Sequence, residues 1–179
     1  MSMTFRVLMV CTGNICRSTM AHQVLQQALT DLRRNGENLD VIVDSAGVSN
    51  EEQGNPIDRR AARVLRDAGY TVHPHAARQI RPHELGTWDL ILAMTGHHRS
   101  NLVRLADMAG VERAENGELG DYSTVDIRMF RSFDPHSSAG DIDVPDPWYG
   151  GHQDFLDTLD VVERTTPQII NHIRHALAH

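Results

Sequence analysis

The chain has 179 residues, of which 40% are apolar and 23% are charged, a composition typical of one globular domain rather than of a fibre or a disordered tail. Its formal net charge of −7 argues against a nucleic-acid partner and against an anionic membrane surface, because both bind basic proteins. Its two cysteines, Cys11 and Cys16, are too few for a secreted disulfide scaffold, so a cytoplasmic location is expected.

Strands and helices are predicted to alternate along the chain. Short apolar runs predict strands, and apolar residues at helical spacing predict helices. The predicted strands cover residues 5–10, 41–45, 88–94 and 125–130, and the predicted helices cover residues 18–34, 56–69, 96–108 and 154–177. Pro167 interrupts the last helix, and a bend is expected there.

This alternation favours right-handed βαβ units and therefore a mostly parallel sheet with helices on both faces. No linker divides the chain, so we expect a single three-layer α/β domain over residues 1–179. Such sheets bind ligands at the carboxyl ends of their strands. The loop after the first predicted strand lies at that end.

Residues 11–18 of this loop read Cys-Thr-Gly-Asn-Ile-Cys-Arg-Ser. A Cys-x₅-Arg segment between a strand and a helix can wrap a phosphate dianion with backbone N–H groups, and the helix N-terminus adds more of them. Gly13 permits the backbone conformation that such a loop requires. The segment therefore predicts a phosphate-binding loop made of Thr12, Gly13, Asn14, Ile15, Cys16, Arg17 and Ser18.

Three side chains of the loop are candidates for chemistry. The positive end of the helix dipole would stabilise Cys11 as a thiolate, which is the nucleophilic form of cysteine. Arg17 would bind two phosphoryl oxygens as a planar fork, and the Ser18 hydroxyl can donate to the Cys11 sulfur. Without this placement, a Cys-x₅-Arg pair occurs by chance in many chains, and Cys11 would be an ordinary buried cysteine.

The loop, together with Asp-Pro-Trp-Tyr-Gly at 146–150, resembles the bacterial form of the low-molecular-weight protein tyrosine phosphatase family. Segments that begin at Ser45, His75, Leu92 and Arg131 also resemble it, in the family's order, so the likeness covers nearly the whole chain. It implies a four-stranded parallel sheet with the phosphate-binding loop after the first strand. It also implies a phosphatase that forms a phosphocysteine intermediate and needs no metal or other cofactor.

Asp146 is the candidate general acid. A phosphocysteine mechanism needs a proton for the leaving group and then a base for the attacking water, and one carboxyl group can serve both steps. Asp146 lies between two prolines that stiffen its loop, and the resemblance implies the same role. An Asp-Pro pair is more often only a turn, which is how we interpret Asp134-Pro135.

The resemblance also implies a supporting pair and an aromatic wall. Ser45 and His75 correspond to residues that hold Asn14, although His75 read alone is an ordinary loop histidine. Trp148 and Tyr149 would form one wall of the entrance, on which a phosphotyrosine ring stacks.

Two residues bear on substrate preference. Glu51, with Glu52, stands at the pocket rim where relatives have an aromatic residue and a histidine, which predicts a preference for basic or small substrates over acidic peptides. Ile15 is bulky and apolar, as in phosphotyrosine enzymes, whereas related bacterial phosphoarginine enzymes carry threonine. The alternatives are a phosphoarginine or small-phosphomonoester phosphatase, and a non-catalytic phosphate-binding or redox-sensing module.

Cys16 predicts redox regulation, through a disulfide with Cys11 that forms on oxidation. The alternative is that Cys16 is a small buried packing residue.

Histidines at 172, 175 and 179 share one helix face, but metal sites need carboxylate or cysteine partners as well, so no metal site is expected. The expected partner is a phosphotyrosine-containing protein such as a bacterial tyrosine kinase, with no nucleic acid and no membrane, and the chain is expected to be a monomer or weak dimer.

Overall fold

The structure, a computed structural model, describes residues 3–114 and 124–179. Four parallel strands form one sheet in the order β2-β1-β3-β4. The strands are β1 (Phe5–Cys11), β2 (Val41–Gly47), β3 (Leu90–Ala93) and β4 (Asp126–Met129). The predicted four-stranded parallel sheet is therefore confirmed, while residues 1–2 and 115–123 of the predicted domain lie outside the described residues.

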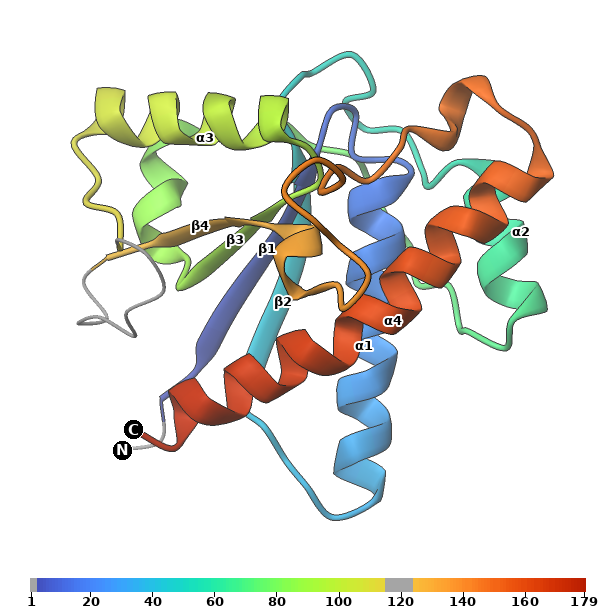
Figure 1. The fold of residues 1–179 in the computed structure, drawn as a ribbon, viewed down its shortest axis with the longest axis horizontal. Helices are drawn as coiled ribbons and strands as arrows, with labels where there is room; N and C mark the ends of the chain where they lie inside the picture. Colours follow the sequence, from blue (N-terminus) through green and yellow to red (C-terminus); the bar gives the residue numbers. More distant parts are fainter. Residues whose placement is uncertain (1–2, 115–123) are drawn as a thin grey trace.

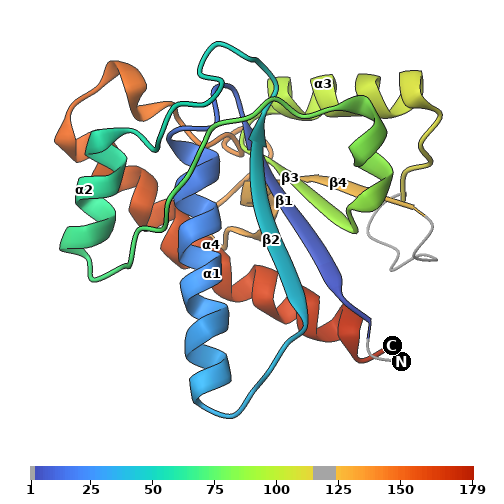
Figure 2. The same cartoon turned by 180° about the vertical axis from the view of Figure 1, so that it is seen from behind.

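Helices cover both faces of the sheet, as predicted. They are α1 (Arg17–Arg34), α2 (Arg59–Asp67), α3 (Gly96–Ala109) and α4 (His152–Leu177). Figure 1 shows α1, α2 and α4 on one side of the sheet and α3 on the other. Seen from behind, β2 forms the edge of the sheet and α1 lies beside it (Figure 2).

The alternation of side chains along β1 builds two cores. Val7 and Met9 are fully buried in the core shared with α1, α2 and α4. Leu8 and Val10 are fully buried in the core shared with α3. Because both faces of the strand are covered, β1 is apolar without interruption after Arg6, as parallel strands in such folds usually are.

Two helix predictions needed correction. The helix predicted over 56–69 is shorter, because the Asp58 carboxylate accepts a hydrogen bond from the Arg60 N–H at 2.8 Å and caps α2 there. The last helix begins at His152 and continues through Pro167 without a break. Buried apolar residues on both sides of Pro167, among them Val162 and Ile169, outweigh the one backbone hydrogen bond that proline removes.

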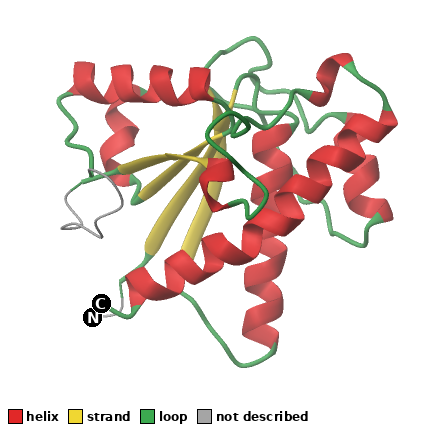
Figure 3. Ribbon diagram, in the orientation of Figure 1, coloured by secondary structure: helices red, strands yellow, loops and turns green. Residues whose placement is uncertain are grey.

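Three short 3₁₀ helices had no counterpart in the sequence prediction: η1 (Pro82–Thr87), η2 (Phe130–Phe133) and η3 (Pro147–Tyr149). The loops after the strands gather at one end of the sheet (Figure 3). None of the helices in the described part of the chain is both long and apolar enough to span a membrane.

Candidate active site

A cavity of about 230 Å³ lies at the carboxyl end of β1. Its walls come from the loop after β1, from the segment after β2 and from the residues just before α4. They are Cys11, Thr12, Gly13, Ile15, Cys16, Arg17, Glu51, Glu52, Asp146, Trp148 and Tyr149. The fold thus brings together candidates that lie as far apart in the sequence as positions 11 and 149.

Cys11 is buried and lines the cavity at the end of β1, before the loop that leads to α1. Its sulfur is 3.1 Å from the Ser18 Oγ. That same oxygen accepts a hydrogen bond from the side-chain amide of Asn14 at 2.9 Å. The Ser18 hydroxyl hydrogen is therefore free to donate to the Cys11 sulfur when that sulfur is a thiolate.

Asn14 holds the loop in shape from behind. Its φ of 62° puts a non-glycine residue in the left-handed region. Its side-chain amide donates to the Ser45 Oγ at 2.9 Å, and its side-chain oxygen accepts from the Arg78 N–H at 3.1 Å. Its backbone oxygen lies 2.6 Å from the His75 Nε2. With its side-chain amide, side-chain oxygen and backbone oxygen paired, buried Asn14 ties the loop to β2 and to the chain around Arg78.

Gly47 lets the end of β2 approach this loop closely. A Cβ at this position would collide with the backbone oxygen of Thr12 and lie 3.2 Å from the carbonyl carbon of Gly13. The Val48 N–H donates to the Cys11 oxygen at 2.9 Å, next to this contact. The close approach therefore requires glycine.

Arg17 and Asp146 form an ion pair in the wall of the cavity. Arg17 is 5% exposed; its Nη1 donates to the Val144 oxygen at 3.1 Å, and its Nη2 lies 3.4 Å from the Asp146 Oδ2. The other carboxylate oxygen of Asp146 accepts from the Trp148 N–H at 3.1 Å. A bound phosphate dianion would compete with Asp146 for the guanidinium of Arg17.

His98 is a residue of this site that the sequence analysis missed. It lies in the first turn of α3, is 2% exposed, and places its Nε2 2.7 Å from the Thr12 Oγ1. Burial lowers the pKa of His98 to about 4, and the charges of Arg17 and His97 act in the same direction. The imidazole is therefore neutral at physiological pH. Its only signal in the sequence was a pair of adjacent histidines after a strand.

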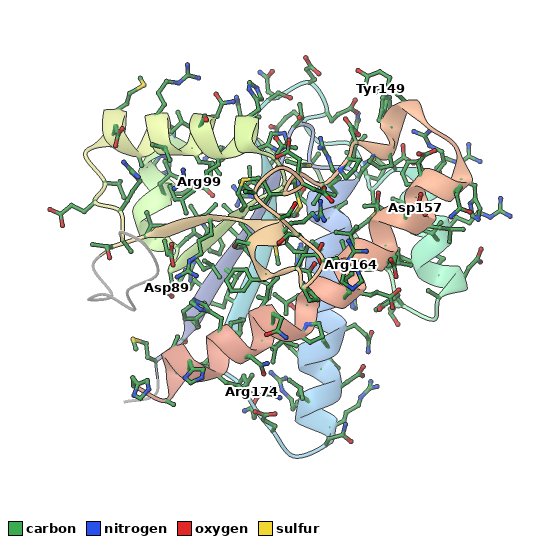
Figure 4. All side chains as sticks on the ribbon, viewed as in Figure 1. Asp89, Arg99, Tyr149, Asp157, Arg164 and Arg174 are labelled. Carbon is green, nitrogen blue, oxygen red and sulfur yellow. The ribbon has the colours of Figure 1, made fainter. Side chains whose placement is uncertain are left out.

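The rim of the cavity is open. Trp148 is 42% exposed and Tyr149 is 89% exposed, and Tyr149 projects from the surface near the start of α4 (Figure 4). Glu52 is held by the Asn55 side chain, which donates to its Oε2 at 2.6 Å, while Glu51 is exposed. Both acidic residues thus stand at the entrance that a substrate must pass.

The remaining candidates lie elsewhere or have other partners. Asp134 is buried away from the cavity, where it pairs with Arg131 and Arg164. His172 packs against the rings of Phe5 and Phe133. Across residues 3–114 and 124–179, no three His, Cys, Asp or Glu side chains are grouped so as to hold a metal ion.

The model of the low molecular weight phosphotyrosine protein phosphatase family matches residues 6–178. A low molecular weight protein-tyrosine-phosphatase of Streptomyces coelicolor is 38% identical over 172 residues, which are 96% of this chain and 95% of that protein. A protein tyrosine phosphatase structure from Entamoeba histolytica has a TM-score of 0.77 at 26% identity, covering 96% of this chain and 98% of that one. The structure of a Drosophila arginine phosphatase has a TM-score of 0.71 at 28% identity, covering 93% and 96%.

Proposed function

Because the chain belongs to the low molecular weight phosphotyrosine protein phosphatase family, we propose that it hydrolyses phosphotyrosine in proteins, and aryl phosphates, through a phosphocysteine intermediate and without a metal. The observation that carries this proposal is the set of Cys11, Arg17 and Asp146 around one cavity. A nucleophile, a cation for the phosphoryl oxygens and a proton donor are the three groups that the reaction needs.

In the first step, the backbone N–H groups of the loop and Arg17 bind the phosphate dianion. The Cys11 thiolate attacks phosphorus, the S–P bond forms, and the P–O bond to the tyrosyl oxygen breaks. Asp146, protonated, gives its proton to that oxygen, so the leaving group departs as a neutral phenol.

In the second step, water attacks the phosphorus of the phosphocysteine. The Asp146 carboxylate takes the proton of that water, the P–O bond forms, and the S–P bond breaks. Cys11 leaves as a thiolate, which the Ser18 hydroxyl, 3.1 Å away, stabilises as a leaving group. Inorganic phosphate is released, and Asp146 is protonated again for the next cycle.

The mechanism is tested with Cys11→Ser and Asp146→Asn on an aryl phosphate in the presence of a chelator. Cys11→Ser should show no turnover above background, and Asp146→Asn should lose about 10²–10⁴-fold, the usual contribution of a general acid. Rapid quenching of the wild type should trap a phosphate on Cys11. Substantial activity of Cys11→Ser, or loss of wild-type activity with the chelator, would contradict the mechanism.

A phosphoarginine substrate is the second candidate, because a structural relative is an arginine phosphatase. Ile15 lines the cavity and presents an apolar side chain, which suits a phenyl ring better than a guanidinium group. Turnover of matched phosphotyrosine and phosphoarginine peptides separates the two, and we expect the phosphotyrosine peptide to be preferred. The role of Glu51 at the rim is tested with phosphotyrosine peptides that differ in the charge of the residues flanking the phosphotyrosine. Glu51→Gln should raise activity on acidic peptides.

We further propose that the substrate is a phosphotyrosine-containing protein such as a bacterial tyrosine kinase, and that the enzyme is a cytoplasmic monomer or weak dimer. Cys11 and Cys16 are both free thiols, which suits a reducing compartment. Capture of phosphoproteins from a lysate by Asp146→Ala, and their release by phosphate, tests the substrate class. Light scattering across concentrations tests the oligomeric state.

A further inference from the structure

Arg60 belongs to α2, but its guanidinium contacts the segment that carries Asp146. Its Nη1 donates to the backbone oxygen of Trp148 at 3.2 Å. The guanidinium carbon also lies 5.2 Å from the centre of the Trp148 ring and 4.6 Å from that of Phe155, both within cation–π range. The N–H of the same Trp148 donates to the Asp146 carboxylate. Arg60 therefore holds Trp148, whose backbone N–H helps to orient that carboxylate.

The other contacts of Arg60 lead to the phosphate-binding loop. Its Nε and Nη2 donate to the two oxygens of the Asp58 carboxylate at 3.2 and 3.1 Å. The backbone N–H of Asp58 donates to the Ile15 oxygen at 2.9 Å. Burial opposes ionisation of Asp58, but the hydrogen bonds from Arg60 outweigh it and lower the Asp58 pKa. The pair is thus charged at neutral pH, and it links the loop around Cys11 to the turn around Asp146.

The turn that carries Asp146 is short. η3 has only three residues; Pro147 is buried, but Trp148 is 42% exposed and Tyr149 is 89% exposed. Before the turn, buried Val144 is anchored by its N–H, which donates to the Met94 oxygen at 2.8 Å. Arg17 contacts Asp146 and the Val144 oxygen, but a bound phosphate dianion competes for the same guanidinium. Arg60 does not line the cavity, so a phosphate bound there does not compete directly for its guanidinium.

We propose that Arg60 is a positioning residue, a clamp between the phosphate-binding loop and the Asp146 turn that keeps the carboxyl group aligned with the leaving-group oxygen. The inference rests on the proposed function, because it takes Asp146 as the general acid. A misplaced acid slows the departure of poor leaving groups, which need the proton, far more than that of good ones, which do not. A loss of folded enzyme lowers both rates by the same factor.

The test compares kcat/KM for phenyl phosphate, a poor leaving group, with that for 2,4-dinitrophenyl phosphate, a good one. Arg60→Met should lower the first about 10–100-fold, the scale expected for a small misplacement of a reacting group, and the second less than about twofold. Arg60→Lys, which keeps the charge but loses the planar fork, should fall between Arg60→Met and wild type. Arg59→Met, an exposed neighbour on the same helix, is the matched control and should match wild type on both substrates.

Asp146→Asn is the reference, and it separates the two ideas. If Asp146→Asn lowers kcat/KM for phenyl phosphate much more than for 2,4-dinitrophenyl phosphate and neither Arg60 variant does, the proposed role of Arg60 is overturned while the proposed function stands. An equal fall on both substrates in Arg60→Met, or a fall as large in Arg59→Met, also overturns the clamp. If Asp146→Asn lowers kcat/KM by the same factor for both substrates, Asp146 is not the general acid. The proposed role of Arg60 is then wrong as well.

Discussion

The side-chain amide of Asn14 donates to the hydroxyl of Ser45 across 2.9 Å, which ties the phosphate-binding loop to the neighbouring strand β2. Both side chains are at most 1% exposed, so no water competes for this bond. The bond helps to hold Asn14 at a positive φ that costs most residues about 1–3 kcal/mol. The shape of the loop is therefore fixed before any substrate arrives.

Asn14→Ala and Asn14→Gly separate the side chain from the backbone conformation. Both remove the hydrogen bonds and should lower kcat/KM about 100-fold, as loss of alignment at a reacting centre does. Asn14→Gly adopts the positive φ freely and should be more stable than Asn14→Ala by about 1 kcal/mol in urea unfolding. Asn38→Ala, an exposed control, should change neither quantity. Full activity of either Asn14 variant would show that the loop holds its shape unaided.

Gly47→Ala should push the end of β2 away from the loop. The added methyl group collides with the Thr12 backbone, which cannot move aside as a flexible side chain could. We expect a loss of about 1–3 kcal/mol in unfolding free energy, the usual cost of overpacking, together with lower activity. Gly140→Ala, where a Cβ meets nothing within 4 Å, is the control. Stability equal to that of the control would contradict the close approach.

His98 should make stability depend on pH in the mildly acidic range. Its pKa falls from 6.5 to about 4 on folding because of burial and the charge of Arg17. Between these two pKa values the unfolded chain binds a proton that the folded chain does not. The contribution of neutral His98 to the free energy of unfolding is therefore complete above about pH 6.5 and is lost as the pH falls from 6.5 to about 4. His98→Asn should flatten this slope in unfolding experiments. His83→Asn, at an exposed position away from His98, should leave the slope intact; equal slopes for wild type and His98→Asn refute the prediction.

Asp134 should be a large contributor to stability. Its fully buried carboxylate pairs with Arg131 and Arg164, and Figure 4 shows Arg164 on α4. Burial opposes ionisation, but hydrogen bonds from both arginines outweigh it and hold the Asp134 pKa well below its usual range. Asp134→Asn leaves Arg131 and Arg164 with only their exposed partners, Asp141 and Asp160, and should cost about 3–5 kcal/mol at pH 7. Asp160→Asn breaks only an exposed bond to Arg164 and should cost less than about 1 kcal/mol.

The Asp134 contribution also has a defined pH dependence. With its pKa lowered on folding, the contribution is full above the unfolded value of 3.8 and is lost as the pH falls further. The gap in unfolding free energy between wild type and Asp134→Asn should therefore narrow by about 1 kcal/mol between pH 4 and pH 3. If this difference in unfolding free energy stays constant with pH, the ion pairs of Asp134 are not its cause.

Cys16 should protect Cys11 from irreversible oxidation. Peroxide converts the Cys11 thiolate to a sulfenic acid; the Cys16 sulfur then attacks it, the S–S bond forms and water leaves. Burial and the negative charge of Asp58 raise the Cys16 pKa, so the attacking thiol must first lose its proton. After excess peroxide and then a thiol reductant, wild type should regain more activity than Cys16→Ser. Equal recovery of the two would remove the idea.

Local pattern was enough to predict the sheet and the loop. The apolar run of β1, the helical spacing in α1 and the position of Cys11 between them can all be recognised within about thirty residues of sequence. The bounds of α2 were missed, because they depend on whether Asp58 acts as a cap or as a helical residue, and its spacing fits both.

The contacts of Arg60 and His98 could not be predicted in this way. Arg60 meets Trp148 across 88 positions of sequence, and His98 meets Thr12 across 86. Such polar pairs have no periodicity of their own, because each partner fits an exposed position of its helix or loop equally well. Only the folded arrangement of the strands decides which of them come within hydrogen-bonding distance.

α1 and α3 both begin at the phosphate-binding loop, the first at Arg17 and the second within reach of Thr12 through His98. Two helix dipoles thus direct their positive ends at one point in a molecule whose net charge is −7. Their attraction is short-ranged, while the repulsion from the acidic surface reaches further and is screened by salt over about 8 Å at physiological ionic strength. We therefore expect added salt to weaken the long-range repulsion of an anionic ligand more than the short-range attraction of the two helix ends.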